Sequence, residues 1–338
     1  MSALPKAVYA PPPVGMRDCI MPEAQRHRDR VQQLITHFNA RGYDFVITPL
    51  FEPASLFESM HTGHKGMQTR ELLRFVDPES GEVVVLRPDI TPQITRLISS
   101  HLRNRPKPWR LCYEGEVIRR QRHRARRQRQ VNQVGFECIG IDDHKEDLQA
   151  IMTVVQGCTH LGLDDYCIDI GHVGVANTLL ENIRDEAIHQ ACTAALSNKD
   201  RHALEHALRN SALPQSQRDE LCALTQLHGD TRILDEARQC LAPQHHSALD
   251  ELQHVVDTLE QHHLSQRLYI DLAELRGQRY YTGISFALLA PGPGQPIGTG
   301  GRYQTSITTN ESLPAVGFAF DMHHLEWALR TADQSRPL

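Results

Sequence analysis

The sequence of 338 residues contains no run of eighteen apolar residues, which excludes a transmembrane helix. Its first residues lack the apolar segment of a secretory signal, so we expect a cytosolic protein. None of the eight cysteines forms a Cys-x-x-Cys pair, and buried free thiols are therefore expected in place of disulfides or a cysteine zinc site. Hydrophobic residues make up 40% and charged residues 23%, which excludes a disordered or collagen-like chain and is typical of a globular protein.

Net positive charge is concentrated in one window, and the rest of the chain is net negative. Residues 101–130 hold ten arginines and one lysine against two glutamates, or +9, which leaves −14 for the rest of a chain of net charge −5. Such a block is either a solvated basic loop or a site for phosphate groups, of a nucleotide or of nucleic acid, and the residues themselves leave this open. Seven of these arginines fall within eleven positions near the end of the window: Arg119, Arg120, Arg122, Arg124, Arg126, Arg127 and Arg129.

The first half of the chain predicts an alternation of helices and hairpins. Apolar periodicity, turn residues and β-branched runs indicate these elements. They are a helix at 22–41, a strand at 43–50, a mobile loop at 53–71, a hairpin of 72–76 with 83–86, a helix at 91–102, a long antiparallel hairpin of 110–118 with 131–141, a helix at 145–161 and a strand at 166–170.

The character of the sequence changes after the strand at 166–170. Residues 174–264 lack strand signals and predict about five helices, which we interpret as a helical insertion domain. Residues 1–173 and 265–330 then form one discontinuous α+β domain, because strands in hairpins disfavour a doubly wound α/β fold. Its later elements are strands at 267–272, 280–289 and 315–320, a final helix, and a tail at 331–338.

Three pairs of adjacent histidines could suggest a metal site. Adjacent residues do not face one another on a helix, and no carboxylate–histidine spacing of a known site accompanies them, so we expect no metal. We also expect no cofactor. The pairs are His245-His246, His262-His263 and His323-His324.

Several ungapped segments resemble class II aminoacyl-tRNA synthetases, and histidyl-tRNA synthetase most closely. Residues 113–140 resemble the motif 2 hairpin, 86–92 the histidine-binding loop, 275–286 and 298–303 the two histidine signatures, and 313–325 motif 3. The similarity covers about 12–170 and 267–326 in family order. It implies an antiparallel sheet of six or seven strands flanked by helices, and a homodimer formed through motif 1 near 40–56.

The resemblance implies that the amino-acid pocket is retained. Asp89 and Thr91 stand where the family holds the substrate amino group, and Gln133 and Glu137 where it lines the histidine site. Residues four apart on a strand share a face. The alternative is that Gln133 and Glu137 are ordinary polar residues on a solvated face. The full set expected to bind histidine is Asp89, Thr91, Arg119, Gln133, Glu137, Arg276, Tyr280 and Tyr281.

The same comparison implies that the ATP-handling residues are altered. Arg119 matches the arginine that contacts the α-phosphate, but Gln121 replaces the glutamate of motif 2. Motif 3 normally ends in Gly-x-Glu-Arg, whereas Asp321 begins this segment and His324 takes the arginine position. A neutral histidine lacks the guanidinium fork, and Asp321 repels a triphosphate. Arg279 also replaces a small or acidic residue.

The family's anticodon-binding domain follows motif 3, and only residues 325–338 follow it here, so we expect that domain to be missing. Residues 168–175 and 294–303 further resemble the family of regulatory subunits of ATP phosphoribosyltransferase. This resemblance implies a noncatalytic protein that associates with a short catalytic subunit in a hetero-oligomer and confers feedback inhibition by L-histidine. The arginine loop could contact the partner or its anionic substrates. The alternatives are a divergent histidyl-tRNA synthetase and a noncatalytic RNA-binding paralogue, and nucleic acid is the less favoured partner.

Overall fold

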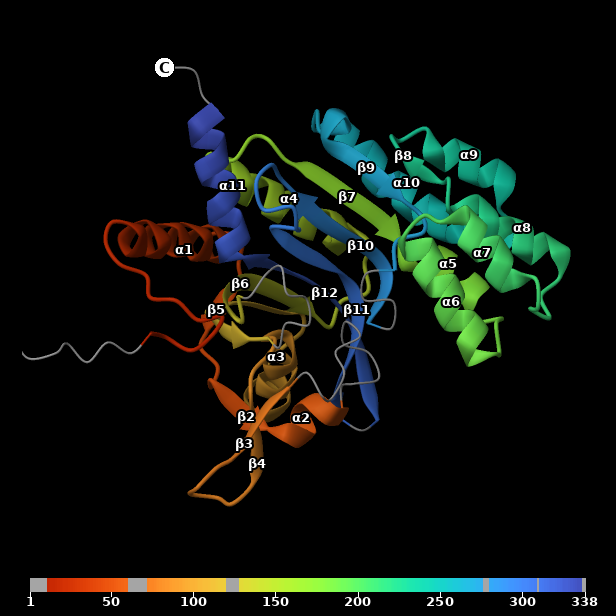
Figure 1. The fold of residues 1–338 in the computed structure, drawn as a ribbon. Coiled ribbons are helices and arrows are strands. Elements are labelled where there is room, and N and C mark those ends of the chain that lie inside the picture. The colour runs from red at the N-terminus through yellow and green to blue at the C-terminus, as the bar shows by residue number, and fades with distance from the viewer. Residues whose placement is uncertain (1–10, 60–71, 120–127, 276–279, 309, 336–338) are drawn as a thin grey trace, which may run out of the picture.

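The computed structural model of the chain describes residues 11–59, 72–119, 128–275, 280–308 and 310–335 (Figure 1). Within these ranges, nine strands form one mixed sheet and three more form a smaller sheet. In spatial order the large sheet contains β1 (Asp44–Val46), β5 (Trp109–Ile118), β6 (Gln130–Ile139), β12 (Glu311–Asp321), β11 (Gly298–Thr308), β10 (Tyr281–Leu289), β7 (Cys167–His172), β9 (Leu268–Asp271) and β8 (His228–Gly229).

The centre of the large sheet separates two kinds of side chain. Alternation along β6 sends Phe136 to one face and Glu137 to the other, and strand pairing brings Phe318 of β12 opposite Phe136. The phenylalanine face carries the core and packs against α1 (Glu23–Asn39), α4 (Lys145–His160) and α11 (Met322–Ser335). The ring of Phe38 on α1 meets that of Phe136 edge-on, with centroids 5.0 Å apart. The opposite face is therefore the one that carries polar groups.

A smaller layer closes one end of that opposite face. The small sheet runs in the order β2 (Phe51–Pro53), β4 (Val83–Leu86) and β3 (Leu73–Val76), beside α2 (Ala54–Ser59). The helix α3 (Thr91–Leu97) continues into one π-helical turn at Ile98–Leu102. The side chain of Ile94 on α3 is fully buried in a cluster with Tyr113 and Tyr303 of the large sheet, so α3 lies against the polar face.

Residues 173–261 form a group of helices at one side of the molecule (Figure 1). The side chain of His172 caps the first of them by accepting from the backbone N–H of Gly174. Buried leucines of this group belong to the same hydrophobic cluster as the sheet core. Its helices are α5 (Val173–Leu180), α6 (Glu186–Ser197), α7 (Arg201–Leu208), α8 (Gln215–Leu224), α9 (Ile233–Cys240) and α10 (His246–Gln261), with short 3-10 turns at Pro243–His245 and Ser265–Arg267.

The structure confirms the α+β fold and corrects several expectations. The large sheet has nine strands among the described residues, of which β1 pairs with β5 and β7 with β9 in parallel. A parallel pair needs a long connection, which the helices at 173–261 provide between β7 and β9. The segment that contains these helices also contains the short strand β8, which was not predicted. The glycine-rich strand β11 was not predicted either. The division into a core and an inserted domain stays a prediction.

Three predicted boundaries were wrong. Of the predicted strand at 43–50, only β1 at 44–46 is formed. The carbonyls of Thr48 and Pro49 accept hydrogen bonds from the Arg87 guanidinium and are therefore not paired with a strand. The loop at 53–71 contains α2, and its residues 60–71 lie outside the described ranges. The tail at 331–338 is helical as far as Ser335, with the Thr331 hydroxyl donating to the Trp327 carbonyl. Within the described ranges, no helix has the length and apolar character needed to cross a bilayer.

Candidate functional site

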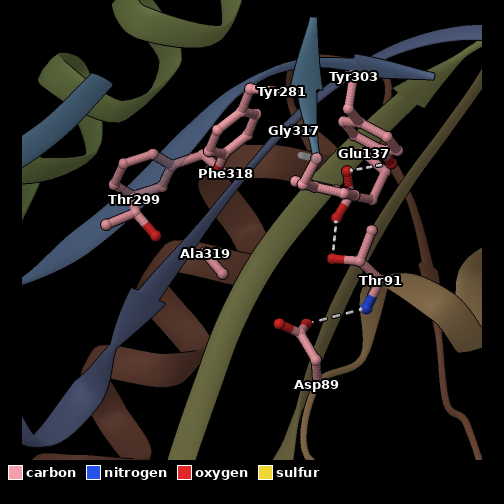
Figure 2. Close-up of a pocket in the computed structure, with 10 residues that line it drawn as sticks. Asp89, Thr91, Glu137, Tyr281, Thr299, Tyr303, Gly317, Phe318 and Ala319 are labelled. Atoms are coloured by element: carbon pink, nitrogen blue, oxygen red, sulfur yellow. Dashed lines mark hydrogen bonds between the residues drawn. The ribbon is translucent and has the colours of Figure 1, made fainter. Parts of the chain in front are cut away.

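A buried carboxylate on the polar face of the large sheet is the centre of the candidate site (Figure 2). Glu137 is 2% exposed, and three hydroxyl groups donate to it. The Thr91 hydroxyl lies 2.7 Å from Oε1, the Tyr113 hydroxyl 3.2 Å from Oε1, and the Tyr303 hydroxyl 2.7 Å from Oε2. The donors come from α3, β5 and β11, so the pocket forms only when these three elements pack together.

Glycine makes room for this carboxylate. Gly317 on β12 lies directly opposite Glu137 on β6, and a Cβ atom at position 317 would stand 1.7 Å from Oε2. The same crowding holds beside Gly135, where a Cβ atom would stand 2.8 Å from the Tyr113 hydroxyl. Since no side chain fits at these positions, the glycines let Glu137 and Tyr113 lie flat against the sheet.

The acidic end of the pocket is formed by Asp89. Its Oδ1 atom accepts from the backbone N–H of Thr91 at 3.2 Å, and its side chain is 4% exposed. Arg119, at the end of β5, lies beside it with Nη2 3.8 Å from Asp89 Oδ2, and Arg119 Nε donates to the carbonyl of Pro88 at 3.0 Å. Asp89, Thr91 and Glu137 therefore line one pocket, and Arg119 lies next to its acidic end.

Aromatic rings form the opposite wall. The ring of Tyr280 stacks on that of Tyr303 with centroids 4.7 Å apart and meets Tyr281 edge-on at 5.0 Å. Burial raises the pKa of Tyr113, Tyr280 and Tyr303 well above its ordinary value, which keeps these hydroxyls neutral and able to donate. The complete lining is Asp89, Thr91, Glu137, Tyr280, Tyr281, Thr299, Tyr303, Gly317, Phe318 and Ala319.

Burial also changes the acidity of Glu137. Removal from water raises the pKa of this carboxyl to about 7, and the negative charge of Asp89 acts in the same direction. The hydroxyls of Thr91, Tyr303 and Tyr113 oppose the rise, because they stabilise the ionised form. Near neutral pH the pocket can therefore hold or release a proton at Glu137.

Gln133 shares the polar face with Glu137 but does not line the pocket. It is 4% exposed and lies opposite Asp321, and its Oε1 atom has no hydrogen-bond partner among the described residues. The interpretation of Gln133 and Glu137 as residues on a solvated face is wrong, since both side chains are buried. A ligand group that donates a hydrogen bond could satisfy the Gln133 oxygen.

Part of the predicted site lies outside the described residues. This part comprises Arg276 and Arg279 of the first signature, together with Gln121, Arg120, Arg122, Arg124, Arg126 and Arg127 of the motif 2 loop. Arg129 is described and closes the base of that loop. Its backbone carbonyl accepts from the Arg119 N–H, and its own N–H donates to the Gly15 carbonyl, both at 2.8 Å.

In the motif 3 segment, the side chains of Asp321 and His324 form hydrogen bonds with backbone groups of the protein. Asp321 Oδ1 accepts from the backbone N–H groups of His323 and His324, at 3.0 and 3.1 Å, and so caps the start of α11. His324 Nδ1 lies 3.0 Å from the Pro296 carbonyl, which can only accept, so Nδ1 carries the proton there. Its Nδ1 atom also lies 3.5 Å from Asp321 Oδ2. These side chains stabilise a helix end.

Sequence reasoning missed Tyr113, Tyr303 and Thr299. Tyr303 ends the quoted segment GTGGRY, and Tyr113 begins the segment that resembles motif 2. A tyrosine in a strand usually predicts packing, and its donation to Glu137 depends on the order of distant strands. Placing the two segments on one face of the same sheet could have found both tyrosines.

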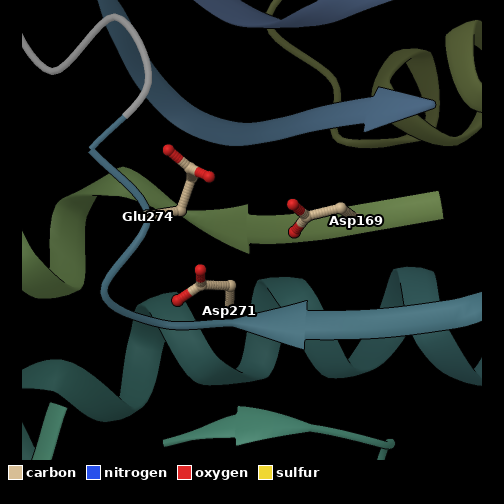
Figure 3. Close-up of side chains that lie close together, drawn as sticks. All are labelled: Asp169, Asp271 and Glu274. Carbon is tan, nitrogen blue, oxygen red and sulfur yellow. The ribbon is translucent and has the colours of Figure 1, made fainter. Parts of the chain in front are cut away.

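A second acidic group lies where β7 runs beside the end of β9 (Figure 3). Carboxylate oxygens of Asp169, Asp271 and Glu274 lie within 4.8 Å of one another, which is the spacing of a possible cation site. The ammonium of Lys199, from the end of α6, donates to Asp271 Oδ1 at 2.7 Å and offsets part of this charge. The sequence did not predict this cluster, and the paired histidines take no part in it.

The sheet, its glycine-lined carboxylate and the motif segments define a protein with the fold of a class II histidyl-tRNA synthetase. A model of the family described as Histidyl-tRNA synthetase matches residues 15–325. A solved structure titled as an ATP phosphoribosyltransferase regulatory subunit/histidyl-tRNA synthetase, from Bacillus halodurans, is 28% identical with a TM-score of 0.82, over 94% of this chain and 82% of that one. A histidine–tRNA ligase subunit from Alicyclobacillus acidocaldarius is 25% identical with a TM-score of 0.78, over 96% and 98%.

Curated relatives narrow the assignment. An ATP phosphoribosyltransferase regulatory subunit from Geobacter sulfurreducens is 34% identical over 98% of this chain and 74% of its own length. One from Thiobacillus denitrificans is 35% identical over 93% of this chain and 96% of its own length. The chain belongs to the family of ATP phosphoribosyltransferase regulatory subunits, within the larger histidyl-tRNA synthetase family.

Proposed function

We propose that this protein binds L-histidine in the Glu137 pocket and transmits its presence to a short-form ATP phosphoribosyltransferase catalytic subunit. The observation that carries the proposal is the buried Glu137 carboxyl, held by three neutral hydroxyls at the centre of the pocket. A carboxyl group placed in this way accepts an N–H from an imidazole ring. The family relationship supplies the kind of partner.

The remaining lining residues fit the other end of an amino acid. The Asp89 carboxylate suits an α-ammonium group, and the Thr91 hydroxyl, which donates to Glu137, keeps lone pairs with which it can accept from the same group. Arg119 suits an α-carboxylate. Gln133, Tyr280, Tyr281 and Arg276 complete the expected set of histidine-binding residues.

We propose that the protein does not activate the amino acid. Synthesis of an adenylate requires cationic groups around a triphosphate. Asp321 instead adds negative charge beside motif 3, and His324 is engaged with the Pro296 carbonyl. The arrangement favours binding without phosphate chemistry, as a regulatory subunit requires.

A homodimer formed through motif 1 is part of the proposal. Four large apolar side chains of the segment 40–56 are exposed: Phe45, Ile47, Leu50 and Phe51. Ile47 is 80% exposed. Apolar groups that lie together on a surface are typical of protein interfaces. An Ile47→Glu variant should shift the protein from dimer to monomer in sedimentation experiments, whereas Tyr269→Phe, at an exposed position on β9, should leave the assembly unchanged.

Feedback follows if histidine binds more tightly to one of two conformations of the assembly. The ligand then shifts the equilibrium of the partner by its differential affinity. We further propose that residues 174–264 form a separate inserted helical domain and that the arginine loop contacts the partner or its anionic substrates.

Calorimetric titration of L-histidine into the protein, with and without the catalytic subunit, tests the proposal. We expect binding that Glu137→Ala abolishes and that the partner changes, together with loss of phosphoribosyltransferase activity when histidine is added. ATP–pyrophosphate exchange by the protein alone should be absent. Lack of histidine binding in both titrations contradicts the proposal.

A further inference from the structure

Glu137 is a buried acid that has donors but no counter-charge among the described residues. Three neutral hydroxyls contact its two oxygens, and no lysine, arginine or histidine of the described ranges forms an ion pair with it. A buried carboxylate without a positive partner costs several kcal/mol. The group therefore has a strong physical reason to be neutral while the pocket is empty.

Among the residues that the structure describes, the elements around Glu137 offer no other group that could balance its charge. Tyr113 on β5, Tyr303 on β11 and Tyr280 before β10 are buried, and their raised pKa keeps them neutral. Asp89, on the segment before α3, adds a second negative charge. Among the described residues, Arg119 is the cation beside Asp89, with its Nη2 atom 3.8 Å from Asp89 Oδ2.

We propose that Glu137 and the imidazole ring of bound histidine share a single proton, so that the buried pair always carries no net charge. This inference rests on the proposed function and adds to it the protonation state that the pocket selects. The proton lies either on the Glu137 carboxyl, with a neutral imidazole, or on the ring, with a carboxylate. In both cases one proton is bound, and the α-ammonium faces Asp89 separately.

This arrangement fixes the number of protons exchanged on binding. Free imidazole side chains titrate near pH 6.5, and burial raises the pKa of Glu137 to about 7. At pH 6 the separate groups hold about 1.7 protons and at pH 8 about 0.1, by these two values. A pair that holds one proton therefore releases about 0.7 at pH 6 and takes up about 0.9 at pH 8. The sign of the exchange reverses slightly below pH 7.

The test is calorimetry of L-histidine binding to the full chain at pH 6 and pH 8, each in two buffers of different ionisation enthalpy. The dependence of the heat on the buffer gives the number of protons. We expect release at the lower pH, uptake at the higher pH, and the tightest binding between them. The measurement uses the unmodified protein, so it does not depend on whether any variant folds.

Two variants assign the proton to the pocket. Glu137→Gln keeps the shape but cannot be protonated, so uptake at pH 8 should disappear while release at pH 6 persists from the ring. Glu220→Gln removes another buried carboxyl, on α8 beside His245, and should leave both values unchanged.

Each outcome has one meaning. Proton exchange of the same sign at both pH values, or none at either, overturns the inference and leaves the proposed function intact. Uptake at pH 8 that survives in Glu137→Gln also overturns it. Failure of histidine to bind at any pH overturns the inference together with the proposed function.

Discussion

Arg302 and Tyr303 are neighbours on β11, and their side chains project from opposite faces of the large sheet. The Tyr303 hydroxyl donates to Glu137 in the pocket, whereas Arg302 Nε donates to Asp147 Oδ2 on α4 at 2.9 Å. Both residues are buried: Arg302 is 6% exposed and Tyr303 is 2% exposed. A shift of this strand that loosened one contact would therefore disturb the other.

On the Arg302 side of the strand, polar contacts extend from Asp147 to the helices at 173–261. His144 Nδ1 lies 3.8 Å from Asp147 Oδ2 and 3.4 Å from Glu251 Oε2 on α10, and Glu251 also contacts His172 at 3.2 Å. His172 caps α5. A continuous series of polar contacts thus joins the back of the pocket strand to the start of the helical segment.

Loss of the Tyr303 hydroxyl should weaken histidine binding. Tyr303→Phe removes one of three donors that hold Glu137 in position, and a hydrogen bond contributes about 0.5–1.5 kcal/mol, which corresponds to a loss of up to about tenfold in affinity. Calorimetric titration measures this change. The matched control is Tyr269→Phe, which removes a hydroxyl that contacts His228 outside the pocket and should have no effect. An unchanged affinity for Tyr303→Phe contradicts the assignment.

The buried pair of Arg302 and Asp147 should stabilise the fold. Asp147→Asn removes the buried one of two carboxylates that contact Arg302, and the exposed Asp142 keeps the other contact at 3.2 Å. The variant should lower the free energy of unfolding by about 2–3 kcal/mol, because the charge of the buried arginine is then only partly balanced. Urea denaturation measures the change. Glu311→Gln, which breaks the exposed pair with Lys107, should cost at most about 1 kcal/mol. Equal effects of the two changes would argue against this view.

A methyl group at position 317 should close the pocket. Gly317→Ala would place its Cβ atom 1.7 Å from Glu137 Oε2, so the carboxylate must move, at an expected cost of about 1–3 kcal/mol in stability and a loss of histidine binding. Gly157→Ala is the control, since its Cβ atom would meet Leu34 at 3.4 Å on the interior of α4. That variant should be neutral or up to about 1 kcal/mol more stable. Normal binding by Gly317→Ala would refute the prediction.

The stability of the unliganded protein should depend on pH through Glu137. Its pKa is raised from 4.5 to about 7, so between these values the folded state binds more protons than the unfolded state. The contribution of Glu137 to the free energy of unfolding is present below pH 4.5 and is lost as the pH rises through about 7, by about 3 kcal/mol in total. Denaturation at pH 5 and pH 8 should show a larger loss for the unmodified protein than for Glu137→Gln. Parallel losses would contradict this.

Local patterns were sufficient for much of the fold. The hairpin of β5 and β6 and the helices α1, α3 and α4 follow directly from apolar periodicity and turn residues. The strand β11 was missed because its glycines weaken any strand signal. They are required by close contact: a Cβ atom at Gly298 or Gly300 would stand 2.4 or 2.8 Å from the Phe318 ring. That contact is set by strand pairing, which local sequence does not encode.

The candidate site was predictable where a motif carried it. Asp89, Thr91 and Glu137 lie together in the structure, as their resemblance to the family's segments predicts. Tyr113 and Tyr303 were not predicted, because their role depends on two hydroxyls from different strands meeting one carboxylate. The cluster of Asp169, Asp271 and Glu274 was missed for the same reason: Asp169 lies more than a hundred residues before the other two in the chain, although all three are close in space.

Asp321 has a consequence for the residue at position 324. Its carboxylate caps α11 and lies beside His324. An arginine at position 324 would stand beside the Asp321 carboxylate, which would pair with the new cation. Replacing Asp321 first would cost the helix its cap, about 1 kcal/mol. The two positions are thus coupled, since the residue at 321 both caps the helix and determines what a cation at 324 would contact.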